Sequence, residues 1–286
     1  MNTEMGLLAV GVAIISWGVG DFLIQRYTRK FEPWETLFAI SIFGMIILTP
    51  FVLDELPMIL NSDQVHILIM GAAALSIAGL LSFEALRQGK LAAIEPIWSI
   101  GTAVAIILAF IVLGEIITLQ QLALIIAMIC GIFLISVKSL GKMWLERGVA
   151  IAVAAAIILG IADFLMGYGA RSIGAVLMNW IIYAFAMMIS TIYLVYNRKI
   201  SEVFRNIARE KVAFLSMCIF YNLAWIAFAF AMTIIPIGIT VALTEGYILV
   251  GVFLGIFLNK EKLILHQIAG VALTVIFGIL LAASVV

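Results

Sequence analysis

Ten runs of mostly apolar residues, each close to the length of a membrane span, follow one another along this chain of 286 residues. A helix needs about 20 such residues to cross the hydrocarbon core of a bilayer. The strands of a membrane β-barrel would instead appear as segments of about 10 residues with alternating polarity. The sequence therefore predicts an all-α integral membrane protein with ten transmembrane helices. The expected spans are 5–24, 34–53, 66–86, 91–113, 119–137, 148–168, 173–196, 212–232, 236–258 and 263–284.

The overall composition agrees with a membrane protein. Hydrophobic residues make up 65% of the chain and charged residues 11%, whereas soluble domains are about half apolar and about a quarter charged. The formal net charge is zero, so there is no electrostatic reason to expect a nucleic-acid partner. The opening residues MNTEMGLLAV include no basic segment before the apolar run. We therefore expect the first span to be retained and not removed as a signal peptide.

The chain contains an internal repeat. The segment GVGDFL from Gly18 and the segment GIADFL from Gly160 share Gly-x-x-Asp-Phe-Leu, 142 residues apart. Near the end of each half, GEIITLQQLALIIAMICGIFL from Gly114 resembles KEKLILHQIAGVALTVIFGIL from Lys260, at an offset of 146. The second match pairs Glu115 with Glu261 and Gln121 with Gln267. A duplicated unit of five spans explains both matches.

An odd number of spans per unit means that the second unit is inserted upside down relative to the first. The expected organisation is a first five-helix repeat over residues 1–140 and an inverted second repeat over 141–286, around a central cavity. All of the 16 Lys and Arg residues except Arg171 fall in odd-numbered loops between the expected spans. Lys and Arg are retained on the cytoplasmic side of a membrane, so this distribution predicts that both termini lie outside.

Five ionisable residues fall inside the expected spans, namely Asp21, Glu84, Glu95, Asp163 and Glu245. Such residues are costly in a bilayer and usually face a cavity or a partner. Glu245 lies near the middle of the ninth span and is the sharpest candidate for binding a coupling proton or a substrate ammonium. The alternative is a protonated glutamate that is hydrogen-bonded to a neighbouring helix.

Glu84 and Glu95 each have a local explanation beside a functional one. Glu84 is three residues before Arg87, so an ion pair on one helix face is expected. Glu95 precedes Pro96, and proline removes a backbone hydrogen bond. Interrupted helices form binding sites in transporters, so Glu95 is a candidate cavity residue. A carboxylate near the start of a helix also stabilises the helix dipole, and both interpretations stay open.

Asp21 and Asp163 occupy equivalent places in the two repeats, about one turn before the ends of the expected first and sixth spans. Inversion predicts that they lie at opposite membrane faces, as gates at two mouths would. The alternative is a structural role, in which each carboxylate holds a helix end or pairs with a basic loop residue such as Arg26 or Arg171.

Aromatic residues accompany the acidic ones along the same helices. Trp17 is one turn before Asp21, and Trp98 is one turn after Glu95. Side chains at this spacing share a helix face, which favours cavity lining; helix packing is the alternative. The predicted lining set is Glu245, Glu95, Trp98, Trp17, Tyr221, Asn222, Trp225 and Tyr247, with Asp21 and Asp163 as possible gating residues.

No metal site, cofactor site or enzyme motif is expected. His66 and His266 have no second ligand nearby, and Cys130 and Cys218 lie singly in apolar runs. The nucleotide-binding pattern GxxxxGK[ST] is absent, as are HExxH and GxSxG. The sequence thus favours a non-enzymatic protein without ATP as its direct energy source.

Short motifs at equivalent ends of the repeats add a family resemblance. With LGE at Leu113–Glu115 and NKEKL at Asn259–Leu263, the doubled five-span pattern resembles the EamA family of the drug/metabolite transporter superfamily. The resemblance implies one bundle in which helices of both repeats line the cavity. Members commonly carry basic residues in the second loop, with the termini inside, whereas this chain has none there. The orientation therefore stays open.

The resemblance and the acidic, aromatic character of the deep residues together favour a secondary active transporter that works by alternating access. The expected substrate is a small organic solute such as an amino acid, a metabolite or a drug-like cation, with export favoured and proton coupling left open. Alternatives are a passive facilitator, a lipid-phosphate translocator, or a membrane sensor or subunit without transport. The protein is expected in the cell membrane, in contact with the lipid bilayer, as a monomer or homodimer.

Overall fold

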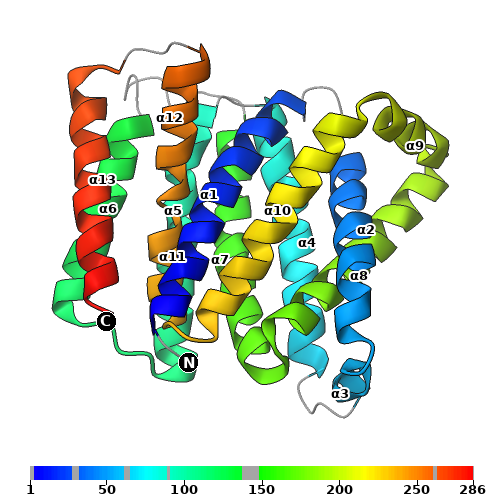
Figure 1. Cartoon of the computed structure of the whole chain (residues 1–286), viewed down its shortest axis with the longest axis horizontal. Helices are drawn as coiled ribbons and strands as arrows, with labels where there is room; N and C mark the ends of the chain where they lie inside the picture. Colours follow the sequence, from blue (N-terminus) through cyan, green and yellow to red (C-terminus); the bar gives the residue numbers. More distant parts are fainter. Residues whose placement is uncertain are drawn as a thin grey trace.

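A computed structural model describes residues 3–27, 32–60, 65–88, 91–136, 148–259 and 263–285. All regular secondary structure in these residues is helical (Figure 1). The helices are α1 (Thr3–Tyr27), α2 (Pro33–Val52), α3 (Leu56–Leu60), α4 (Val65–Gln88), α5 (Leu91–Leu113), α6 (Leu119–Ser136), α7 (Val149–Ile173), α8 (Ala175–Tyr196), α9 (Ile200–Arg209), α10 (Lys211–Met232), α11 (Ile237–Thr244), α12 (Tyr247–Asn259) and α13 (Leu265–Ala283).

The predicted all-α membrane fold is confirmed. Eight of the described segments are long and apolar enough to cross a membrane, and α5 and α6 supply two shorter apolar segments, Ile97–Leu113 and Leu119–Ile135. These ten segments correspond to the ten expected spans. The ninth span is divided between α11 and α12, and the short helices α3 and α9 lie in connections between spans.

Equivalent helices of the two repeats run in opposite directions. In Figure 1, α1 ascends from the amino terminus while α7 descends, and the two termini lie at the same edge of the bundle. We call this edge the termini face. The opposite edge is called the basic face, because among the described side chains it holds Arg87, Arg198, Lys199, Arg205, Arg209 and Lys211.

The two repeats pack against each other reciprocally. The first helix of each repeat contacts the third and fourth spans of the other: α1 lies against α10 and α12, and α7 lies against α4 and α5. The second spans α2 and α8 contact each other, as do the fifth spans α6 and α13. The bundle is therefore one body whose core is shared between the repeats.

The glycine of the repeated Gly-x-x-Asp motif is required at these reciprocal contacts. A Cβ atom on Gly160 would lie 2.8 Å from the Cβ of Val104 in α5. A Cβ atom on Gly18 would lie 2.8 Å from the Tyr247 carbonyl oxygen and would overlap Val250 in α12. Val104 and Val250 are themselves 146 residues apart, so the same close approach occurs once in each half of the bundle.

Glutamines at the start of α6 and α13 join these two helices to each other. Gln267 accepts a hydrogen bond from the Ile264 N–H (3.2 Å) and donates one to the Ile135 carbonyl at the end of α6 (2.9 Å). Gln121 donates in the same way to the Ser284 carbonyl at the end of α13, at 3.5 Å. Each side chain caps its own helix and reaches the last turn of its partner.

We expect Gln267→Leu to lower the free energy of unfolding by about 1–3 kcal/mol, the cost of leaving buried polar groups without partners. Gln267 is 6% exposed, whereas Gln121 makes longer bonds at a more exposed position. Gln121→Leu is thus the matched control and should lower the free energy of unfolding by less than Gln267→Leu does. Thermal unfolding in detergent measures both changes, and equal losses for the two variants would contradict this account.

The connection between α8 and α10 at the basic face contains the amphipathic helix α9, which the sequence analysis treated as loop. The Lys199 ammonium donates hydrogen bonds to both carboxylate oxygens of Glu32, at 2.6 and 2.7 Å. These bonds raise the pKa of Lys199 above its ordinary value. The amide of Asn206 donates to the buried Glu35 carboxylate (3.2 Å). These contacts fix α9 against the first turn of α2.

Candidate functional site

A cavity of about 150 Å³ lies within the bundle, with room for roughly ten water molecules. Its described lining residues come from both repeats, on α1, α2, α4, α5, α7, α8, α10, α11 and α12. In α1, α2, α4 and α5, nearly all of them lie in the half of the helix nearer the basic face. The paired helices α6 and α13 contribute none of the described lining residues, so the fifth spans stand outside the site.

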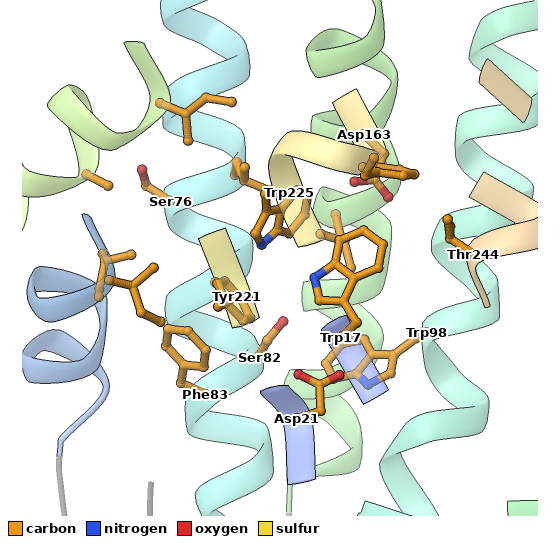
Figure 2. Close-up of a pocket in the computed structure, with 18 of the residues that line it drawn as sticks. Trp17, Asp21, Ser76, Ser82, Phe83, Trp98, Asp163, Tyr221, Trp225 and Thr244 are labelled. Carbon is orange, nitrogen blue, oxygen red and sulfur yellow. The ribbon is translucent and has the colours of Figure 1, made fainter. Parts of the chain in front are cut away.

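Three carboxylic acids line this cavity: Asp21, Asp163 and Glu245 (Figure 2 labels the two aspartates). Glu245 is 9% exposed and Asp163 is 6% exposed. The Thr102 hydroxyl donates a hydrogen bond to Oε1 of Glu245 at 2.7 Å. Oε2 of Glu245 and Oδ1 of Asp163 have no hydrogen-bond partner among the described residues. Two buried acids that line one cavity therefore each keep an acceptor atom available.

Glu245 lies at a break in the ninth span. α11 ends at Thr244 and α12 begins at Tyr247, and the Gly246 N–H donates to the Leu243 carbonyl in a tight turn (3.1 Å). The expectation of one continuous ninth helix is therefore wrong, because a glycine follows the glutamate where the chain turns. The carboxyl-terminal end of a helix carries partial negative charge, and such ends coordinate cations in transporters with discontinuous helices. The break adds to the preference of this cavity for positive charge.

The interruption expected at Pro96 is not observed. α5 runs unbroken from Leu91 to Leu113. Pro96 is the sixth residue of this helix, so it removes the N–H that would bond to the Ala92 carbonyl, and the helix continues past this lost hydrogen bond. The Glu95 side chain lies outside the part of the chain that the structure describes.

Aromatic rings form one wall of the cavity. The Trp17 ring lies edge-on to Trp225, with centroids 5.0 Å apart, and 4.9 Å from Phe228. Tyr221 is 6.1 Å from Trp225. In Figure 2, Trp17 and Trp225 are drawn between Asp163 and Asp21. The structure thus brings Trp17, Trp98, Tyr221, Trp225 and Tyr247 of the predicted set to the cavity.

Asn222 is a correction to that predicted set. Its amide donates hydrogen bonds to the Ile40 carbonyl of α2 (3.3 Å) and to the Cys218 carbonyl of its own helix (2.8 Å). It is not among the described lining residues. One residue further along a helix is a rotation of about 100°, so the neighbour of cavity-lining Tyr221 faces α2 instead.

Asp21 and Asp163 both line the cavity, Asp21 in the last two turns of α1 and Asp163 in α7, and a gating role for them stays a prediction. α7 continues to Ile173, so Asp163 is in its interior and not near its end. Pairing with Arg171 is also excluded, because Arg171 forms an ion pair with Glu115. The expected local pair of Glu84 with Arg87 is observed at 2.9 Å. The Arg26 side chain is outside the described residues.

Sequence reasoning missed several smaller polar lining residues. Hydroxyl groups within otherwise apolar spans were the available signal, but most such groups only bond to their own helix, as Ser76 does to the Ala72 carbonyl. The missed polar lining residues are Ser41, Ser76, Ser82, Tyr183 and Thr244. None of the described lining residues is Lys, Arg or His, so the described wall offers acids, hydroxyls, aromatic rings and aliphatic side chains but no basic group.

Residues 4–137 and 146–284 each match the model of the EamA-like transporter family. The chain belongs to this family. The resemblance seen in the sequence is therefore confirmed, as is the presence of two EamA repeats. The protein is a multi-pass membrane transporter and not an enzyme. The two matched segments fall on either side of residues 140 and 141, and the boundary itself stays a prediction.

Two comparisons place this EamA-family protein among known proteins. An uncharacterized protein of Methanocaldococcus jannaschii is 30% identical over 140 residues, which are 49% of this chain and the whole of that protein. A protein of known crystal structure is 14% identical, with a TM-score of 0.77 over 99% of this chain and 98% of that one. The second comparison supports the fold alone.

Proposed function

We propose that this EamA-family protein is a secondary active transporter that exchanges a small aromatic or amphipathic organic cation for protons by alternating access. The observation that carries the proposal is the set of three carboxylic acids in one cavity, with no basic residue among the described lining residues. An ionised carboxylate is expensive to bury without a partner. A bound ammonium or proton would remove that cost.

The aromatic wall supports an organic cation over an inorganic one. Trp17 and Trp225 pack edge to face beside the acids. A cation over the face of an indole gains about 0.5–2 kcal/mol, and an apolar substrate body gains from burial against the same rings. A substrate with a positively charged group and an aromatic or alkyl body would use both features.

Two buried acids in one cavity supply a physical basis for exchange. Asp163 and Glu245 both line it, and each keeps an oxygen without a partner among the described residues. Carboxylates that share a cavity repel each other when both are ionised, so a proton or a substrate cation stabilises the pair. Because these two species satisfy the same charge, binding of one favours release of the other. This competition is the minimum requirement for an exchanger.

Export is the favoured direction. Among the described side chains, every Lys and Arg except Arg171 lies at the basic face, and basic loops are retained in the cytoplasm. With that orientation in the cell membrane the basic face is cytoplasmic, so an exporter would load its cavity from that side.

Proteoliposomes with an acidic interior and an alkaline exterior test the proposal, with ethidium as the cationic probe and 1-naphthoate as an anionic aromatic control. We expect ethidium to accumulate inside while the proton gradient lasts and to leak out when nigericin removes it. Naphthoate should not accumulate. Ethidium equilibration without accumulation would identify a passive facilitator, and preferential uptake of naphthoate would overturn the cationic assignment. Stabilisation against heat by the transported probe supplies an independent binding measurement.

A further inference from the structure

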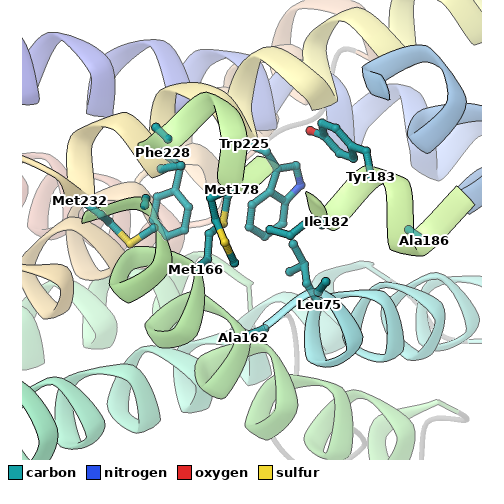
Figure 3. Packing of buried hydrophobic residues seen from close by; sticks show 14 of the residues in the cluster. Leu75, Ala162, Met166, Met178, Ile182, Tyr183, Ala186, Trp225, Phe228 and Met232 are labelled. Carbon is teal, nitrogen blue, oxygen red and sulfur yellow. The ribbon is translucent and has the colours of Figure 1, made fainter. Parts of the chain in front are cut away.

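The cavity is closed toward the termini face by tightly packed apolar side chains. Beyond Asp163 on α7 comes Met166, and beyond Phe228 on α10 comes Met232, each 0–1% exposed. Met178 of α8 is also fully buried. Figure 3 shows these three methionines and Phe228 gathered in one cluster. We call this cluster the methionine plug; because both helices run toward the termini face, it separates the cavity from that face.

An ion pair between the repeats lies past the methionine plug, at the termini face itself. Nη1 of Arg171, near the end of α7, is 2.7 Å from Oε1 of Glu115, in the connection between α5 and α6. The Glu115 side chain is only 11% exposed and that of Arg171 is 31% exposed. Such shielding makes the pair stronger than an ordinary surface salt bridge.

The same two residues also hold the connection between α10 and α11. Glu115 accepts hydrogen bonds from the Ile237 N–H (3.0 Å) and the Gly238 N–H (3.3 Å), at the start of α11. Arg171 donates to the carbonyl oxygens of Met232 (2.7 Å) and Ile235 (3.0 Å). Helix ends leave such groups without intrahelical partners. Glu115 and Arg171 satisfy groups at the end of α10 and the start of α11, and they join two connections, α5–α6 and α10–α11, to the end of α7.

α11 joins this ion pair to the cavity. The helix is held by Glu115 at its first residue and is followed by Glu245 at the helix break. All eight of its residues are buried, and its length is about 12 Å. A short helix packed on all sides moves as a rigid rod, so a displacement of Glu245 displaces the groups that Glu115 binds.

We propose that Glu115 and Arg171 form a latch that holds the cavity closed toward the termini face, and that movement of α11 releases it. The proposal rests on alternating access but not on the identity of the solute. Opening toward the termini face must separate α7 from the connection between α5 and α6. This breaks the ion pair together with the two backbone hydrogen bonds of either Glu115 or Arg171, because the connection between α10 and α11 can stay with only one of them. Weakening the latch therefore shifts the population toward the state open at that face.

Cysteine labelling measures this shift directly. The reporter is Gly79→Cys, because Gly79 lines the cavity and a Cβ atom there meets no atom within 4 Å. It is placed in a background of Cys130→Ser and Cys218→Ala, in sealed vesicles of both orientations. A membrane-impermeant methanethiosulfonate reagent is then added. We expect Glu115→Gln to raise the labelling rate from the termini face about tenfold, since it removes a charged hydrogen-bonding group, and to lower the rate from the basic face.

Arg171→Gln should act in the same direction. Arg171→Lys should have a smaller effect, because it keeps the charge but loses the guanidinium fork that reaches two carbonyl groups. The matched control is Lys199→Gln, which breaks an ion pair of similar length with Glu32 at the basic face. It should not raise labelling from the termini face.

If Glu115 and Arg171 only stabilised the fold, replacing them would raise labelling from both faces, or would lower the melting temperature without changing the relative labelling rates from the two faces. Unchanged labelling from the termini face in both Glu115→Gln and Arg171→Gln, with the protein folded, would overturn the latch. Because labelling requires no solute, this result is independent of whether ethidium is transported.

Discussion

Glu245→Gln should abolish proton-driven accumulation of ethidium in proteoliposomes. Glu245 is buried at the break between α11 and α12, and one of its carboxylate oxygens has no partner in the described part of the chain. Glutamine has nearly the same shape and can still accept the hydrogen bond from Thr102, but it neither carries a proton nor attracts a cation. Loss of one charge-assisted contact weakens binding by about ten- to a hundredfold.

The pattern of residual activity distinguishes coupling from folding. Downhill exchange of ethidium should persist weakly through Asp163, while accumulation against a gradient should be lost. Glu84→Gln makes the same chemical change in a residue that pairs with Arg87 and does not line the cavity. Ethidium accumulation by this variant should therefore match that of the parent protein. If Glu245→Gln retained full gradient-driven accumulation, the role assigned to this carboxyl group would be wrong.

Gly160→Ala should be among the most destabilising conservative changes in this protein. The added methyl group would lie 2.8 Å from the Val104 Cβ and would overlap the Gly101 carbonyl oxygen, so α5 and α7 would have to separate. Overpacking of this kind costs about 1–3 kcal/mol, and the upper end is expected because the obstacle is backbone. The separation would also displace Thr102 from Glu245. Thermal unfolding in detergent measures the loss.

Gly11 provides the matched control, since a Cβ atom there meets nothing within 4 Å. Gly11→Ala should leave stability unchanged or raise it by up to about 1 kcal/mol, because alanine is the better helix former. The same substitution is thus expected to act in opposite directions at two helical glycines. Similar effects at both positions would refute the close-contact explanation.

The sequence predicted the architecture well because membrane insertion leaves few choices. A run of about 20 apolar residues has to form a helix in lipid, and two matching offsets disclosed the repeat. Glu245 could be singled out for the same reason, since an acid in the middle of an apolar span has few explanations. The deep tryptophans followed from their spacing relative to the acids.

Other features depended on three-dimensional neighbours that spacing does not reveal. Glu115 and Arg171 are far apart in sequence and were treated as ordinary loop residues. Asp163 was placed near a helix end because the sixth span was expected to stop at residue 168, whereas α7 continues to Ile173. The turn after Glu245 went unpredicted, because TEGY interrupts neither the hydropathy nor the length of the ninth span. Asn222 was expected to line the cavity, but it comes one residue after Tyr221 and its side chain faces α2 instead.

The reciprocal packing of the repeats means that neither half of this chain is a self-sufficient folding unit. α1 finds its partners α10 and α12 in the other half, and α7 finds α4 and α5 there. Each half made alone would present an uncovered helical surface with nothing to bury it. If the chain were cut between α6 and α7, we expect the two fragments to fold only when they associate with each other.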